Sequence, residues 1–155
     1  MKFEKFVKTL GGHGVIYRYK DTNWLASSTV LMRIPDDVSG VLSESISEMP
    51  EGLKKFIEMA WKNDPCLLTK AELPRGNSGI KEAIRIYETE HSGVVCRIDN
   101  DSYSLIDKGD ILEIYPEYDS EQSVDVAKAL VIRAVTPDPD EEPQIVGLSF
   151  PLPNN

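Results

Sequence analysis

Residues 15–35 read VIYRYKDTNWLASSTVLMRIP, and this stretch decides the fold class. It opens with five β-branched, aromatic or basic residues typical of a strand, and the polar residues 20–23 then form a turn signal. A return strand begins at residues 24–26. Over residues 30–34 Val, Met and Ile alternate with other side chains, which predicts a third strand that ends at Pro35. We therefore expect an antiparallel meander.

Two amphipathic helices are predicted on either side of this meander. Residues 3–10 place apolar side chains at the spacing of one helical stripe, and Gly11 with Gly12 supplies a stop. Residues 50–62 predict the clearest helix of the chain, since five apolar side chains form a complete stripe along it. These five are Leu53, Phe56, Ile57, Ala60 and Trp61.

The rest of the chain predicts mostly strands. Residues 36–48 are acidic and serine-rich and indicate a loop with a short helical turn. Residues 80–90 fit a helix or a strand, and we favour a strand because a hairpin through 91–93 follows. Further strands are expected at 66–68, 94–98, 103–106, 111–115, 129–135 and 145–150. The intervening segments are a loop at 75–79, a turn at 99–101, a short helix or loop at 120–126 and an exposed acidic connector at 137–143.

These elements predict an α+β fold in which antiparallel meanders pack against two main helices. The 155 residues suit a single domain over 1–155, within which 1–75 and 80–155 can form two halves. Residues 24–35 and residues 103–116 are each expected to form two strands joined by a turn, and each segment ends in proline. The two segments are either a pseudo-repeat or two unrelated, ordinary hairpins.

Both cysteines lie in apolar runs, and the chain is long enough to bury a core without disulfides. We expect Cys66 and Cys96 to be buried, reduced thiols. The first residues lack an apolar signal core, and no apolar run approaches membrane-spanning length. A cytoplasmic protein without a membrane partner is the resulting expectation.

Charge is unevenly distributed along the chain. Residues 1–79 carry 11 Lys and Arg against 10 Asp and Glu, whereas residues 80–155 carry 6 against 16, for a net charge of −9. An anion of this size is repelled by phosphate, which disfavours broad, non-specific nucleic-acid binding but allows a local basic face. The candidate face consists of lysines on the polar sides of the two helices, although solvated helix faces often carry lysine. They are Lys2, Lys5, Lys8, Lys54 and Lys62.

Residues capable of catalysis or metal binding do not form a recognisable constellation. Ser78 lacks the Gly-x-Ser-x-Gly spacing of a nucleophile elbow, and the two histidines, His13 and His91, lie in glycine-containing turns. Four aspartates lack the register of an EF-hand and are better explained as turn formers. They are Asp99, Asp101, Asp107 and Asp110. We expect no metal or cofactor, and a binding protein rather than an enzyme, with a hydrolase as the least favoured alternative.

The order of the predicted elements resembles the DNA sliding-clamp, or processivity-factor, fold of phages and mobile elements. The resemblance is carried by residues 3–10, by 15–35 with Trp24 at its hairpin, by 50–62 and by the closing 146–152. It implies helices that line a ring around DNA and sheets that form an acidic outer wall. The five lysines would then share one surface and contact DNA.

The resemblance also implies partners. DNA or replication proteins would be bound, and a one-domain chain would need several copies of itself to close a ring. The alternative is a protein–protein interaction module that binds no nucleic acid. Such a module would use an exposed strand or the acidic tail to recognise a basic partner.

Overall fold

The structure is a computed structural model that describes residues 1–38, 46–62, 66–72, 84–89, 95–119, 124–135, 137–138, 140–141 and 143–152. Its helices are α1 (Phe3–Leu10), α2 (Glu51–Lys62) and α3 (Asn100–Tyr103), with a short 3-10 turn at Asp36–Val38. Its strands are β1 (Val15–Tyr19), β2 (Thr22–Ala26), β3 (Val30–Arg33), β4 (Ile46–Glu48), β5 (Cys66–Glu72), β6 (Ile84–Thr89), β7 (Val95–Asp99), β8 (Ile111–Asp119), β9 (Val124–Ala134) and β10 (Gln144–Ser149).

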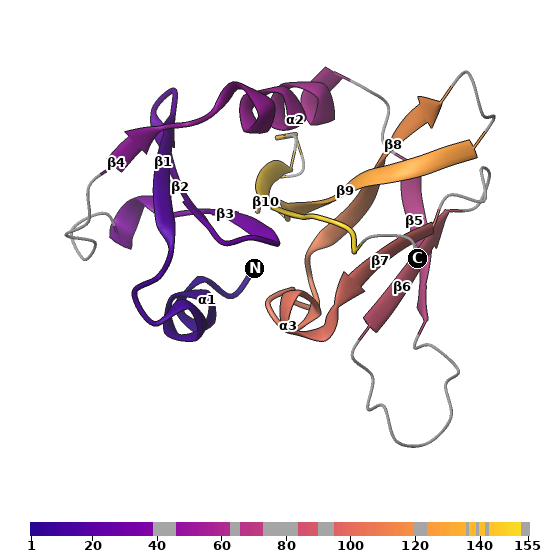
Figure 1. The fold of residues 1–155 in the computed structure, drawn as a ribbon, viewed down its shortest axis with the longest axis horizontal. Helices are drawn as coiled ribbons and strands as arrows, with labels where there is room; N and C mark the ends of the chain where they lie inside the picture. The colour runs from indigo at the N-terminus through magenta and orange to yellow at the C-terminus, as the bar shows by residue number, and fades with distance from the viewer. Residues whose placement is uncertain are drawn as a thin grey trace.

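The described strands form one sheet in the order β4-β1-β2-β3-β10-β9-β8-β5-β6-β7 (Figure 1). Neighbouring strands run antiparallel, except that β4 lies parallel to β1. The predicted α+β class is confirmed. The last strand of the chain, β10, lies in the middle of the sheet between β3 and β9, and β5 lies between β8 and β6.

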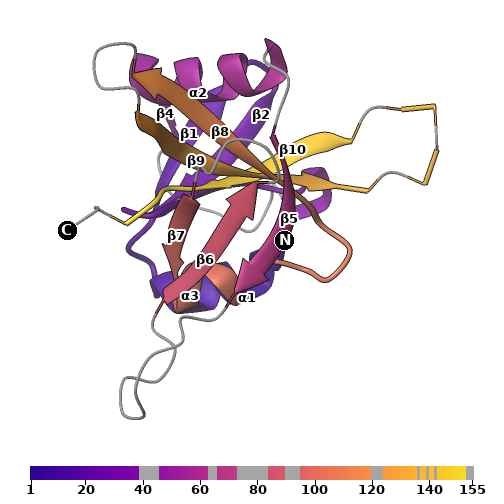
Figure 2. The same ribbon diagram turned by 90° about the vertical axis from the view of Figure 1, so that its right-hand side faces the viewer.

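Strand alternation places the two main helices on opposite faces of the sheet. Successive side chains of a strand point to opposite faces, so Leu31 packs in one core cluster and Met32 in another. Ile57 of α2 belongs to the cluster of Leu31, whereas Phe6 of α1 belongs to the cluster of Met32. Figures 1 and 2 accordingly show α2 above the sheet and α1 below it.

Both predicted helices form for the reasons that the sequence gives. Helix α1 ends at Gly11, which adopts a left-handed conformation with φ 54° and donates its N–H to the carbonyl of Val7. Glycine adopts this conformation without a steric penalty, which makes it a common helix terminator. On α2 the residues Leu53, Phe56 and Ile57 pack on the sheet, and the Phe56 ring meets the Phe150 ring edge-on at 5.6 Å between centroids.

The segment 99–106 differs from the prediction. It was expected to be a turn followed by a strand, but residues 100–103 form α3. Asp99 caps this helix, because its Oδ1 accepts a hydrogen bond from the Ser102 N–H at 2.6 Å. An aspartate in the N-cap position satisfies a backbone donor at the helix start and favours helix over strand. The pseudo-repeat with residues 24–35 therefore lacks its first strand.

Other boundaries also differ. Strand β4 lies in the segment predicted as a loop, and residues 124–126 belong to β9 rather than to a short helix or loop. Strand β5 is longer than expected, and β8 continues past Pro116 through an irregularity in its register with β9. The strand assignment of 84–89 and its antiparallel partner β7 are confirmed. The loop at 75–79, Ser78, the hairpin turn at 91–93 and His91 lie outside the described residues.

The buried thiol of Cys96 gives a first test of the core. Cys96 is fully buried, and burial raises the pKa of its thiol from 9.0 to about 12. In a Cys66→Ser variant, we expect Cys96 to resist a thiol reagent at pH 8 and to react fully once urea unfolds the chain, since the thiolate is the reactive form. A fast native-state reaction would contradict this burial.

The same shift has a consequence for stability. When the pKa of a group is higher in the folded state, its contribution to stability is fully present below the unfolded pKa and is lost as the pH rises toward the folded pKa. The free energy of unfolding should therefore fall as the pH rises from about 9 toward 12.

Candidate nucleic-acid interface

The lysines of α1 lie together on one exposed face. Phe3 and Phe6 are buried against the sheet, which turns the intervening polar positions of the helix to solvent. Lys2, at the N-cap, is followed by Lys5 and Lys8 at intervals of three residues. All three are exposed. They line one surface hollow of about 510 Å³ together with Phe3, Glu4 and Asp107.

Two carboxylates share this hollow, and one of them has a counter-charge of its own. Asp107 Oδ2 lies 3.1 Å from the amino group of Met1, which also lies 2.9 Å from Asp110 Oδ2. Lys5 Nζ lies 3.5 Å from the carbonyl oxygen of Ser104, at the end of α3. The three ammonium groups thus meet Glu4 and an already paired Asp107, so the hollow has a positive surplus.

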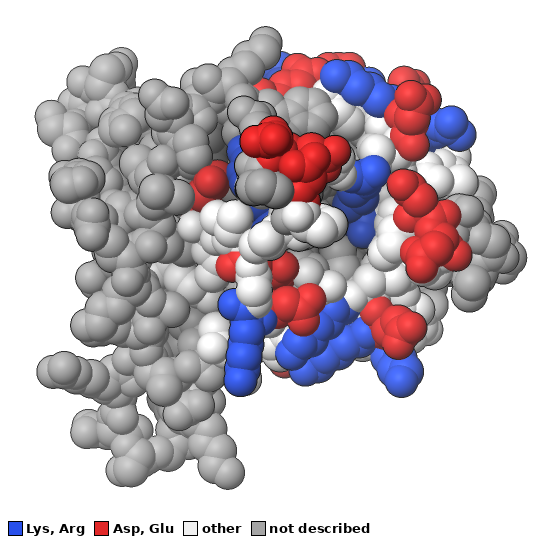
Figure 3. Space-filling model, turned by 180° about the vertical axis from the view of Figure 1, so that it is seen from behind, with Lys and Arg blue, Asp and Glu red and all other residues white. Residues whose placement is uncertain are grey.

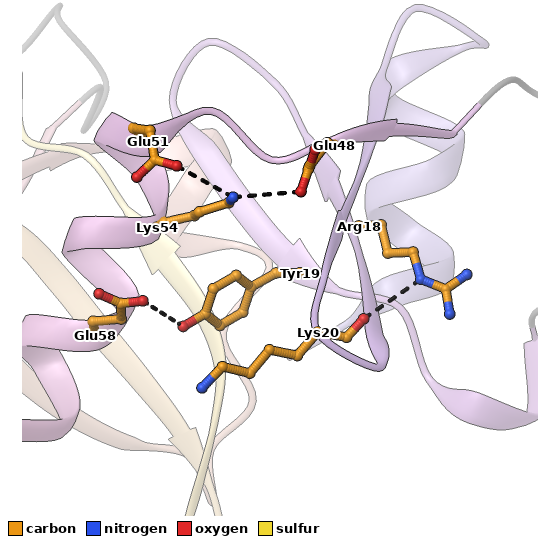
Figure 4. Close-up of polar contacts among 7 residues, drawn as sticks. All are labelled: Arg18, Tyr19, Lys20, Glu48, Glu51, Lys54 and Glu58. Carbon is orange, nitrogen blue, oxygen red and sulfur yellow. Dashed lines mark hydrogen bonds and ion pairs between the residues drawn. The ribbon is translucent and has the colours of Figure 1, made fainter.

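Lys54 of α2 does not join this surface. Lys54 projects from the helix on the opposite face of the sheet, and its Nζ lies 3.4 Å from Glu51 Oε1 and 3.6 Å from Glu48 Oε1 (Figure 4). The hydrogen bond to Glu51 raises the pKa of Lys54. The side chain of Lys62 lies outside the described part. Lys54 therefore does not share a surface with the α1 lysines. Successive side chains of a strand point to opposite faces of the sheet, and α1 and α2 pack on these opposite faces.

The exterior shows only a partial separation of charge. Figure 3 shows basic side chains gathered along the lower edge of the molecule, at the level of α1, while acidic and basic side chains intermingle over the upper part. The α1 row is therefore one basic face of the described surface, and the wider separation expected from the sequence does not extend to Lys54 of α2, which lies between two carboxylates.

The comparisons with known proteins identify no relative: no family model, no curated protein and no solved structure matches the chain. The resemblance to sliding clamps consequently stays a prediction. Among the described helices, none is long and apolar enough to cross a membrane.

The candidates for chemistry lie apart. His13 is exposed and borders a hollow of about 220 Å³ that no described carboxylate or second histidine lines. Asp99 caps α3, and Asp110 accepts the Asp107 N–H at 2.9 Å as well as contacting Met1. Within the described ranges, no three His, Cys, Asp or Glu residues are grouped as metal ligands would be.

Three further cations converge where sequence reasoning placed no site. Lys20, Arg33 and Arg133 line a cavity on the α2 face of the sheet. Lys20 lies just beyond the end of β1, and its φ of 53° breaks the strand alternation. The one available signal was Arg133, a charged residue in the otherwise apolar run 129–135.

Proposed function

We propose that this chain is a non-enzymatic binding protein that contacts DNA phosphates through the lysine row of α1. The supporting observation is that Lys2, Lys5 and Lys8 line one hollow beside the N-terminus of a helix. Ammonium groups and helix N-termini are both favourable partners for phosphate oxygens. The net charge of −9 opposes association, so binding depends on this local surface and weakens steeply with salt.

This proposal assigns DNA contact to the lysines of α1 alone, whereas the resemblance to sliding clamps implies contact by lysines of both helices. Three lysines on one helix neutralise few phosphates, so one copy binds weakly and several linked copies bind more tightly through their combined effective concentration. Assembly of several chains around DNA, as in the clamps that the sequence resembles, would supply that gain.

Neutralising the α1 row tests the proposal. We expect Lys2→Gln, Lys5→Gln and Lys8→Gln together to weaken binding to duplex DNA and to reduce the slope of log K against log salt by about 3, since each phosphate contact contributes about 0.9. Fluorescence anisotropy across a salt series measures both quantities.

A matched control uses the other helix. The variant Lys54→Gln with Lys62→Gln removes charge from α2 and should leave binding almost unchanged. Loss of binding in this control but not in the α1 variant would contradict the proposal and favour a surface on α2. Absence of any salt-dependent DNA binding by the unmodified chain would rule the proposal out.

One observation favours a second function, an interaction module that binds no nucleic acid. Strand β4 ends the order of described strands, its three residues are exposed, and Ile46 has 48% of its surface accessible. An edge strand of this kind can accept an extended peptide as an additional strand. Since Glu48 of this strand is acidic, a basic peptide would be the partner.

Nuclease treatment separates the two functions. Partners recovered from the source lysate should be lost after nuclease if DNA bridges them, and retained if the chain binds a protein directly.

A further inference from the structure

The cavity on the α2 face lies at one end of the strands, where β1, β3 and β9 finish and β2 and β10 begin. Its volume is about 360 Å³, at the lower end of the range for small-molecule sites. Its lining residues are Tyr19, Lys20, Thr22, Trp24, Arg33, Arg133, Pro143, Gln144 and Ile145.

The described lining contains three cations and no carboxylate, in a chain whose net charge is −9. Glu113 compensates one of the three from behind, because its Oε2 accepts from Arg133 Nε at 2.9 Å. Asp36 lies 3.8 Å from Arg33 Nη2, but its side chain is 86% exposed and water screens it. The described lining of the cavity therefore gathers three cationic side chains around one opening, and two of them are arginines.

Neutral oxygens hold the two guanidinium groups in place. Arg33 Nη1 donates to Gln144 Oε1 at 2.5 Å, and Arg133 Nη1 donates to the carbonyl of Pro143 at 3.0 Å. These bonds orient the cations without cancelling their charge. The sheet register fixes their positions as well, since Arg33 lies opposite Trp24 and Arg133 lies opposite Ile145.

Lys20 completes the set from the β1–β2 turn. Its Nζ lies 5.3 Å from the centre of the Tyr19 ring, and Figure 4 shows the lysine side chain extending beside that ring while Arg18 points the other way. The Tyr19 hydroxyl donates to Glu58 Oε1 at 3.0 Å. Lys20 adopts φ 53°, a conformation that a residue with a Cβ rarely takes and that glycine would take without strain. A lysine thus occupies a position whose backbone conformation favours glycine.

We propose that this cavity binds a phosphate group, either as free phosphate or as the phosphomonoester of a small molecule. A phosphate carries about −1.5 to −2 charges at neutral pH and is therefore attracted to a cavity lined by three cationic side chains. Guanidinium groups donate in a planar fork that fits phosphate oxygens, and two of the three cations are arginines. The proposal is independent of the DNA interface, which lies on the opposite face of the sheet.

Calorimetric titration at constant ionic strength tests it, with inorganic phosphate, adenosine monophosphate and acetate as separate probes. We expect saturable binding of phosphate, of the nucleotide or of both, and at least tenfold weaker binding of acetate. Binding of phosphate alone identifies the free ion as ligand, and binding of the nucleotide alone identifies an ester. Equal binding of acetate, or no binding of either phosphate probe, would overturn the proposal.

Two variants locate the site. Arg33→Gln keeps a hydrogen-bonding side chain at the cavity and should weaken the phosphate probe at least tenfold. Lys20→Gly should weaken it several-fold and at the same time raise Tm, because the turn is relaxed; this rise shows that the variant has folded. Lys54→Gln, on the same face but outside the cavity, should bind normally. Undiminished binding in both Arg33→Gln and Lys20→Gly would refute the assignment.

The DNA proposal can fail separately. The variant that lacks the three α1 lysines should retain phosphate binding in the cavity, whereas Arg33→Gln should retain the salt-dependent DNA binding. Loss of phosphate binding on removal of the α1 lysines would place the phosphate on α1 and overturn the cavity assignment.

Discussion

Replacing Arg133 with methionine should lower the free energy of unfolding by about 3–5 kcal/mol at neutral pH, because it leaves a buried carboxylate without its cation. Glu113 has 6% of its surface exposed, and Arg133 Nε is its partner among the described residues. The two side chains lie on the neighbouring strands β9 and β8, and they are only 13% and 8% exposed. The loss of the bond to Pro143 adds to the effect. Urea denaturation followed by circular dichroism measures it.

Two further variants make this result specific. The double variant Glu113→Leu with Arg133→Met removes both charges and should recover most of the stability, because an apolar pair needs no compensation. Lys54→Met is the matched surface control: its two carboxylate partners are 85% and 80% exposed, so about 1 kcal/mol or less should be lost. Equal costs for Arg133→Met and Lys54→Met would show that the Glu113 pair is not buried.

Truncating Leu148 to alanine should cost about 3–5 kcal/mol, the range for a fully buried leucine whose neighbours cannot collapse into the space left. Leu148 is 0% exposed and lies opposite Leu31 of β3 on one side and Val131 of β9 on the other. Leu148 lies on β10, which joins the two parts of the sheet, so the truncation would leave its void at the centre of the molecule. The midpoint of urea unfolding should move to lower concentration.

Val135→Ala provides the control for this truncation. Val135 is 62% exposed, and its loss should change the free energy of unfolding by less than about 0.5 kcal/mol. A cost for Leu148→Ala as small as this would mean that β10 is peripheral, which the topology contradicts.

Local sequence signals predicted the elements whose apolar side chains recur at the spacing of a helix or a strand. Helices α1 and α2 and the β1–β3 meander follow from such periods. Helix α3 was missed although Asp99 is a good N-cap, because the short apolar run after it also fits a strand. Strand β4 has three exposed residues and no alternation of its own, so its pairing with β1 could not be read locally.

The candidate sites divide in the same way. The row of Lys2, Lys5 and Lys8 was predicted because residues three apart lie on one helix face. The convergence of Lys20, Arg33 and Arg133 could not be predicted, since these cations lie on three strands or turns and are separated by up to 113 residues. The order of the sheet brings them together.

By itself, then, the sequence determined the two main helices, most of the strands, and which of their faces are apolar, since these properties depend on neighbours a few residues away. Only the tertiary structure decided that β10 lies at the centre, that α1 and α2 cover opposite faces, and that three distant cations surround one cavity. The physical reason is that strand order is set by burial of apolar faces between segments far apart in the chain, and no local period records that pairing.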